Sequence, residues 1–210
     1  MYKYIKRVLD ILLAIIGLLF AFIPMIVVAV AIKLESKGPV IFKQIRTGKN
    51  GKNFNLYKFR SMAKDNDVKN FKEENKITKV GKFIRRTSLD ELPQLFNILK
   101  GDMSFIGPRP WIVEYYENFN AHQKRRVEVL PGITGLAQAT GRNNLTVFEK
   151  INYDIEYVDN YSFIMDLKVV FMTIKTVLSK EGAELSKYGI KDEIDDLKNQ
   201  KNKEDNLIRI

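Results

Sequence analysis

The chain has 210 residues, a basic excess of 35 Lys and Arg over 25 Asp and Glu, no cysteine and one histidine, His122. A chain of this length forms one domain of ordinary size, and its net charge of +10 favours an anionic partner: phosphorylated substrates, acidic lipid headgroups or nucleic acid. The composition excludes disulfide scaffolds, thiolate metal sites and cysteine nucleophiles, so we expect any catalysis to use carboxylates, Arg, Lys and a hard metal ion.

The N-terminal segment is membrane-inserted by its composition. Residues 11–32 form a run of 22 residues without a charged or polar side chain, and about 20 such residues span a bilayer as a helix. Pro24 lies near the middle, where proline bends a helix, and both flanks of the run are basic. A re-entrant helix broken at Pro24 keeps both flanks in the cytoplasm, as the positive-inside rule prefers, whereas a simple spanning helix does not. A plain anchor is the alternative.

A short β-hairpin is predicted for residues 38–62, where apolar and polar side chains alternate around a glycine-rich turn from Gly48 to Gly51. Lys58 and Arg60 on its second strand are either a basic, substrate-binding face or an ordinary exposed strand face. Residues 64–76 are charged and nearly free of apolar side chains, which indicates an exposed loop.

A helix is predicted to begin near Ser88, because Ser88 and Glu91 form a capping-box pattern, and to end at Gly101. Pro93 fits only in a first helical turn, so Asp90 is the alternative N-cap. The apolar face of this helix would consist of Leu92, Leu95, Phe96 and Leu99.

A turn is predicted from Gly107 to Pro110, where glycine and two prolines occur together, and three segments follow it. Residues 112–129 look helical and highly charged, with His122 as a surface residue, and residues 131–144 are glycine-rich and irregular. Residues 148–161 form a helix with one stripe of tyrosines, which favours packing over ligand binding. The stripe consists of Tyr153, Tyr157 and Tyr161.

An amphipathic helix is predicted for residues 166–180, and it faces either a protein core or a membrane interface. Its apolar face would consist of Leu167, Val170, Phe171, Ile174 and Val177. Residues 182–210 are mostly charged and predict a loosely ordered tail with at most a short helix. The fold class is therefore α+β, mainly helical with a small hairpin or sheet. The expected divisions are a membrane segment 1–36, a catalytic domain 37–181 and the tail.

The segment 81–110 carries the strongest chemical pattern. Asp90 and Glu91 are adjacent carboxylates at a predicted helix start, where ionised carboxylates are stabilised and can attack phosphorus or bind a divalent cation. Arg85 lies just upstream and can neutralise phosphate oxygens. Favourable helix-cap electrostatics alone would explain the same two acidic residues.

Two later turns offer further donors. Arg109 is fixed between two prolines, which orders a donor at low entropic cost. The turns Pro131 to Gly135 and Gly141 to Asn143 present backbone N–H groups and Arg142, although neither matches a known phosphate-binding loop.

Together, RRTSLDELPQLFNILKGDMSFIGPRP, preceded by LYKFRSM and followed by PGITGLAQATGRN, resembles the bacterial sugar transferase family, specifically its small monotopic phosphoglycosyl transferases. The resemblance runs from about Tyr4 to Lys180. It implies transfer of a sugar-1-phosphate from a UDP-sugar to polyprenyl phosphate, typically undecaprenyl phosphate, with release of UMP, as the first membrane step of surface glycan or glycoprotein assembly. It also implies a cytoplasmic membrane location, with the catalytic domain on the cytoplasmic face.

The resemblance implies roles for particular residues as well. Asp90 matches the family nucleophile, and Glu91 its partner, with Mg²⁺ close to both. Arg85 matches a phosphate-binding arginine. The remaining substrate-binding candidates are Arg109, Lys58, Arg60, Gly135, Gln138 and Arg142. Membrane lipids are expected partners, and nucleic acid is not. The resemblance also allows downstream glycosyltransferases, or a second copy of the chain, as partners. The sequence does not identify which sugar is transferred. The rival hypothesis is a non-catalytic basic module that binds anionic lipid or nucleic acid.

Overall fold

The computed structural model describes residues 1–63, 77–141, 144–179 and 189–208. This described part of the chain is mainly helical with two small two-stranded sheets, which confirms the α+β class. It divides into two compact units, one of Tyr4–Gln44 with Asn55–Gly101 and one of Met1–Lys3 with Ile45–Phe54 and Asp102–Ile210. We call them the N-terminal unit and the C-terminal unit.

The N-terminal unit contains the long apolar helix α1, most of the predicted hairpin and the acidic pair. It holds most of α1 (Tyr2–Glu35), parts of β1 (Ile41–Thr47) and β2 (Asn53–Phe59), and the whole of α2 (Lys79–Arg86), the 3-10 turn η3 (Leu89–Glu91) and α3 (Gln94–Lys100). The 3-10 turn η1 (Lys49–Gly51) joins the two strands of the hairpin. The turn end of the hairpin, residues 45–54, belongs to the C-terminal unit. The hairpin and the end of α3 at Gly101, which has a φ of 89°, are as predicted.

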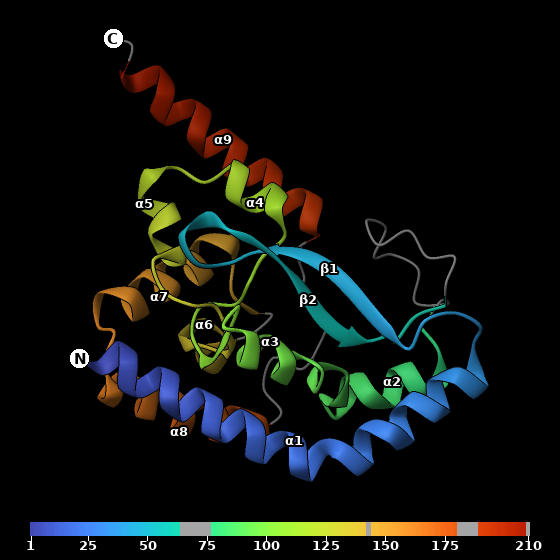
Figure 1. The fold of residues 1–210 in the computed structure, drawn as a ribbon. Helices are drawn as coiled ribbons and strands as arrows, with labels where there is room; N and C mark the ends of the chain where they lie inside the picture. The colour runs from blue at the N-terminus through green and yellow to red at the C-terminus, as the bar shows by residue number, and fades with distance from the viewer. Residues whose placement is uncertain (64–76, 142–143, 180–188, 209–210) are drawn as a thin grey trace. The chain divides into compact units, whose positions relative to one another are not determined.

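Helix α1 is long and apolar enough to cross a membrane. It is helical without interruption from Tyr2–Glu35, with Pro24 inside it, and its ribbon changes direction along its length rather than breaking (Figure 1). One stripe of α1 is buried against the rest of the protein, whereas large apolar side chains such as Phe20 and Ile23 are exposed. The buried stripe consists of Lys6, Asp10, Ala14, Ala21, Val28 and Ile32.

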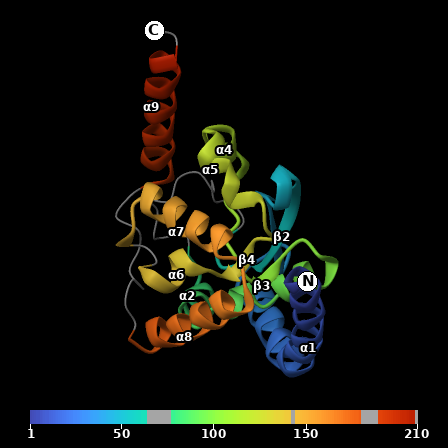
Figure 2. The ribbon, with the colours of Figure 1, turned by 90° about the vertical axis from the view of Figure 1, so that its left-hand side faces the viewer.

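The C-terminal unit packs helices around a short parallel sheet (Figure 2). Its elements are β3 (Ser104–Ile106), α4 (Val113–Glu117), α5 (Ala121–Lys124), the 3-10 turn η4 (Arg125–Val127), β4 (Gly132–Thr134), α6 (Leu136–Thr140), α7 (Val147–Asp159), α8 (Phe163–Ser179) and α9 (Ile190–Ile208). In the sheet, Ser104 pairs with Gly132 and Ile106 with Thr134. Helix α6 packs against both α7 and α8.

Several local predictions for the C-terminal unit need correction. The single helix expected over 112–129 is divided into α4, α5 and η4, because the capping box of Asn120 and Gln123 starts a new helix. The segment 131–144, expected to be irregular, contains β4 and α6. The tyrosine stripe of α7 does serve packing, with Tyr157 fully buried. His122 is exposed on α5, as expected.

Helix α8 confirms the predicted helix, and its predicted apolar face is the exposed one. Phe171, Ile174 and Val177 are each more than half exposed, while Met165 and Val169 form the face that packs into the unit. Periodicity located the helix but did not reveal which face the protein covers. The predicted loop 64–76 lies outside the described residues.

Candidate active site

The acidic pair lies in η3, a 3-10 turn between α2 and α3. The expected capping box at Ser88 is wrong: Ser88 has a left-handed backbone with a φ of 56°, and its side chain makes no cap hydrogen bond. Helix α3 begins only at Gln94, with Pro93 as its N-cap. Because α3 is short and starts after the acidic pair, a helix dipole no longer explains why Asp90 would be ionised.

Apolar packing holds this turn in place. Leu89 and Leu92, on either side of Asp90 and Glu91, pack against a buried cluster of Val28, Ile32, Phe59 and Ile84. This cluster joins α1, β2 and α2, so three elements fix the backbone of η3. Asp90 itself is 9% exposed. The two carboxylates are therefore held at a largely buried position near the surface, where an ordered charge can act on a bound substrate.

Lys58 supplies the positive charge beside the pair. Its Nζ atom donates a hydrogen bond of 2.7 Å to Glu91 Oε1 and lies 4.0 Å from Asp90 Oδ2. The three side chains are between 13% and 20% exposed, so solvent screens this cluster only partly. The strand position of Lys58 thus places it at the acidic pair, whereas the sequence suggested either a basic, substrate-binding face or an ordinary exposed strand face.

Arg85 and Arg60 have different surroundings. Arg85 is exposed at the end of α2, and its Nε atom donates to Ser61 Oγ at 2.9 Å. Arg60 is buried, and its guanidinium donates to the carbonyl oxygens of Ser36 and Lys37 at 2.8 Å each. These bonds show that Arg60 connects the segment after α1 to the hairpin. Of the two arginines, Arg85 is the one exposed at the surface.

Arg109 lies in the C-terminal unit, in the turn between β3 and α4. Its side chain is exposed, while Pro108 and Pro110 are buried. Its carbonyl oxygen accepts a hydrogen bond of 2.8 Å from Arg126, a buried residue that also forms an ion pair with Asp154. Burial raises the pKa of the Asp154 carboxyl above its ordinary value, while the charge of Arg126 acts in the opposite direction.

Gly135 and Gln138 lie around the start of α6 in the same unit. A Cβ atom at Gly135 would lie 2.2 Å from the Gly107 carbonyl oxygen, so a glycine is required for the close approach of the two turns. Both polar atoms of the Gln138 side chain are buried and have no hydrogen-bond partner within the described part of the chain. Arg142 falls outside the described residues.

Sequence reasoning missed the buried pair of Arg126 and Asp154, as well as Ser61. The partners are 28 residues apart, and no local pattern links them. No group of three or more His, Cys, Asp or Glu side chains suited to a metal ion occurs among the described residues. Two adjacent carboxylates nevertheless suit Mg²⁺, which is commonly held by one or two carboxylates together with substrate phosphates and water.

Comparison with known proteins now defines the class. Residues 1–180 match the family model described as "Bacterial sugar transferase", and the chain belongs to this family. It is 48% identical over 202 residues to "Galactosyl transferase CpsE" of Streptococcus agalactiae serotype III (strain NEM316), covering 87% of this chain and 45% of the relative. It is 43% identical over 186 residues to "Uncharacterized sugar transferase EpsL" of Bacillus subtilis (strain 168), covering 88% of this chain and 92% of the relative.

A third relative has a more specific name. The chain is 44% identical over 181 residues to the "UDP-glucose:undecaprenyl-phosphate glucose-1-phosphate transferase" of Klebsiella pneumoniae, covering 80% of this chain and 39% of the relative. The chain therefore spans less than half the length of two of these three relatives and nearly the whole length of the Bacillus protein.

Proposed function

We propose that the chain transfers a sugar-1-phosphate from a UDP-sugar to polyprenyl phosphate and releases UMP. The observation that carries this proposal is the acidic pair itself: two carboxylates in a rigid turn, with Lys58 2.7 Å from Glu91 and 4.0 Å from Asp90. Relatives named as undecaprenyl-phosphate sugar-phosphate transferases support the same reaction class.

The proposed reaction has two displacements at one phosphorus atom. A carboxylate oxygen of Asp90 bonds to the phosphorus that carries the sugar, the bond from this phosphorus to UMP breaks, and UMP leaves with the electron pair. An oxygen of polyprenyl phosphate then bonds to the same phosphorus, and the bond to Asp90 breaks. The carboxylate is regenerated and no net proton transfer is required. Glu91 and Lys58 fix the charge around Asp90 through both steps.

The cationic side chains would bind the phosphates. Arg85, held at its Nε by Ser61, presents its remaining N–H groups to phosphate oxygens, and positioning with charge neutralisation is the main contribution a protein makes to such transfers. Arg109, Gly135, Gln138 and Arg142 are assigned to the uridine diphosphate by their motifs. The buried amide of Gln138 supports this assignment, because such a group is stabilised by a polar ligand.

Asp90 and Glu91 would hold Mg²⁺, with the diphosphate supplying further oxygen ligands. The ion would supply neutralisation of the negative charge on the diphosphate. The protein itself contributes the fixed carboxylates, and Lys58 limits their mutual repulsion.

We further propose that α1 enters and leaves the membrane on the cytoplasmic face. Near its start, Arg7 donates to the carbonyl oxygens of Ile98 and Leu99 at 2.6 and 2.9 Å. At its end, the Glu35 carboxylate accepts from the backbone N–H groups that begin α2, at 2.6 and 2.9 Å. One folded unit thus holds α1 both at Arg7, near its start, and at Glu35, its last residue, which supports a single membrane side for both.

Cysteine labelling tests this topology, because the chain has no cysteine of its own. Lys3→Cys and Lys37→Cys should react in inverted vesicles and stay protected in intact cells. Phe22→Cys, on the exposed apolar face, should resist labelling from both sides. Pro24→Ala should raise the fraction of Lys3→Cys chains labelled from outside, since it restores a straight helix. Labelling of Lys3→Cys from outside in the parent chain contradicts the re-entrant topology.

The decisive experiment is a panel of UDP-sugars with undecaprenyl phosphate, assayed for UMP. Asp90→Asn should lower turnover at least about 10³-fold, equivalent to about 4 kcal/mol of barrier, whereas the exposed control Asp159→Asn should not. UDP-sugar alone should release about one equivalent of UMP per enzyme and leave a hexose-phosphate on the peptide containing Asp90. UDP as the product would indicate transfer of the sugar alone, and no turnover with any donor would favour a non-catalytic module.

A further inference from the structure

Helix α9 lies beyond residue 180, where the family match ends, yet it is part of the core of the C-terminal unit. The segment 182–210 was expected to be a loosely ordered tail, but residues 190–208 form a helix. Ile194 and Leu197, 3% and 1% exposed, pack into one buried cluster with Tyr115 of α4 and Ile151 of α7. A helix that buries two large apolar side chains in this way is a docked element, and its purpose is not explained by the family reaction.

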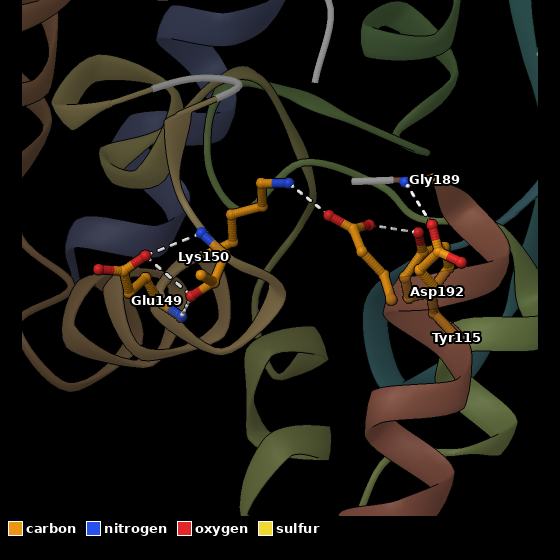
Figure 3. Close-up of polar contacts among 7 residues, drawn as sticks. Tyr115, Glu149, Lys150, Gly189 and Asp192 are labelled. Atoms are coloured by element: carbon orange, nitrogen blue, oxygen red, sulfur yellow. Dashed lines mark hydrogen bonds and ion pairs between the residues drawn. The ribbon is translucent and has the colours of Figure 1, made fainter. Parts of the chain in front are cut away.

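Glu193 of α9 forms hydrogen bonds with both α4 and α7. Its carboxylate accepts hydrogen bonds from the Tyr115 hydroxyl at 2.5 Å and from Lys150 Nζ at 2.7 Å, and the residue is 8% exposed. Figure 3 shows the Lys150 side chain extending from α7 toward α9. Tyr115 lies next to α9 in the same view. Burial and the hydrogen bond to Glu193 raise the pKa of Tyr115 well above its ordinary value, so Tyr115 remains a donor. At the start of α9, the Asp192 side chain accepts from Gly189 N.

From Tyr115 the contacts continue to the turn that contains Arg109. The Tyr115 ring packs edge-on against Trp111, with ring centroids 4.8 Å apart. The guanidinium of Arg126 stacks over the Trp111 ring at 4.1 Å and donates to the Arg109 carbonyl oxygen at 2.8 Å. Asp154 pairs with the same guanidinium in a fully buried site. Each link up to Arg126 is a direct contact between side chains, and the last link is a hydrogen bond from the Arg126 side chain to the Arg109 backbone.

The backbone at Arg109 is held on three consecutive carbonyl oxygens. The Arg109 carbonyl accepts from Arg126, the Pro110 carbonyl from Arg46 at 3.2 Å, and the Trp111 carbonyl from the Thr47 backbone N–H at 3.0 Å. The Trp111 ring packs on both Tyr115 of α4 and Arg126. A displacement of Tyr115 would therefore shift Trp111 and Arg126, and with them the backbone at Arg109.

We infer that α9 is a brace for the Arg109 turn, with Glu193 as its positioning residue. Glu193 fixes Tyr115, Tyr115 fixes Trp111, and Trp111 with Arg126 fixes the direction in which Arg109 leaves the turn. The consequence for catalysis rests on the proposed function, in which Arg109 contacts the donor diphosphate. Under that function α9 sets the affinity for the UDP-sugar and leaves the acidic pair and the lipid acceptor unaffected.

The test compares Glu193→Ala and Glu193→Gln with a control on the same helix. Asp195→Ala is matched, because Asp195 is also an acidic residue of α9, but its side chain is 52% exposed and forms a surface ion pair with Lys198. Glu193→Ala should raise the KM for the UDP-sugar about 5- to 20-fold, because a small misplacement of a binding group weakens substrate binding strongly. The value of kcat and the KM for polyprenyl phosphate should stay within about 2-fold. Glu193→Gln keeps an acceptor for Tyr115 and should recover most of the loss.

Hydrogen exchange supplies a second measurement that does not depend on activity. Backbone amides of residues 109–116 should exchange faster in Glu193→Ala and in Tyr115→Phe than in the parent chain and in Asp195→Ala. Lower thermal stability with an unchanged donor KM and unchanged exchange at 109–116 would overturn the brace and leave α9 a stabilising helix only. Equal losses of kcat with every substrate would overturn it as well. If the parent chain releases no UMP, the proposed function fails, and the exchange result alone decides whether the brace exists.

Discussion

Gly81, in the first turn of α2, offers a prediction in which two physical effects have opposite signs. Replacing glycine by alanine in a helix ordinarily stabilises a protein by about 1 kcal/mol. Here the added Cβ atom would lie 1.9 Å from the carbonyl oxygen of Ser61, 2.7 Å from its carbonyl carbon and 2.9 Å from Thr78 Oγ1. Two of these atoms belong to the backbone, so α2 and the segment around Ser61 must separate.

The separation removes several contacts together. Overpacking of this kind costs about 1–3 kcal/mol, and loss of the Thr78 cap, whose Oγ1 accepts from Gly81 N at 2.9 Å, adds about 1 kcal/mol. After the gain in helix propensity, Gly81→Ala should destabilise the protein by about 2 kcal/mol. For a chain of this size that lowers Tm by about 4–8 °C. Because Ser61 holds Arg85, UMP release well below Tm should also fall.

The measurement is thermal unfolding in nanodiscs of one lipid composition, with Gly17→Ala as the control. Gly17 is also inside a helix of the N-terminal unit, but its Cβ would meet only the Leu95 side chain, at 3.4 and 3.6 Å. Gly17→Ala should therefore be neutral or slightly stabilising. If Gly81→Ala is as stable as Gly17→Ala, the close contact between α2 and Ser61 does not exist in solution.

Three further predictions follow from the same structure. Asp154→Asn should lower the stability by about 3–5 kcal/mol in thermal unfolding, because it leaves the buried Arg126 charge without compensation; a loss below about 1 kcal/mol would mean that this pair is solvated. Ser88→Gly should retain stability while Ser88→Val loses about 1–2 kcal/mol, since the φ of 56° suits glycine, and equal stability of the two variants would argue against that backbone. Excess chelator should abolish UMP release and Mg²⁺ should restore it, whereas full turnover in chelator would mean that Asp90 and Glu91 act without a divalent cation.

Local periodicity predicted the helices that bury a regular face and failed where a single residue changes the backbone. The hairpin, α7 and α8 were predicted because each carries a repeating apolar pattern over many residues. The start of α3 was predicted wrongly, because the left-handed backbone of Ser88 depends on tertiary packing and no sequence pattern reports it. A signal for α9 was present in the spacing of Ile190, Ile194 and Leu197, which repeats on one helical face, but the high charge of the segment obscured it.

In the candidate site too, the sequence predicted some residue roles and could not predict others. The acidic pair could be recognised because it lies within a long motif that resembles the family, whereas helix-cap electrostatics alone would explain two adjacent carboxylates. The role of Lys58 could not be decided, because a strand exposes alternate residues whatever they bind, and only the fold brings Lys58 within 4.0 Å of Asp90. Arg60, two residues further on and just past the end of β2, has the opposite outcome because it donates to the carbonyl oxygens of Ser36 and Lys37, which follow α1.

The contacts of α1 also show how this long apolar helix contributes to the fold around the acidic pair. Val28 and Ile32 of α1, 6% and 2% exposed, lie in the same cluster as Leu89 and Leu92, the residues that hold the acidic pair. Removal of residues 1–36 would uncover Phe59 and Ile84 and leave the backbone of η3 without one of its three supports. The apolar face of α1 toward the protein is thus part of the core that positions Asp90, while its other face is available to lipid. Under the proposed function, membrane anchoring and the geometry of the acidic pair both depend on α1. A fragment without α1 should therefore lose activity as well as membrane binding.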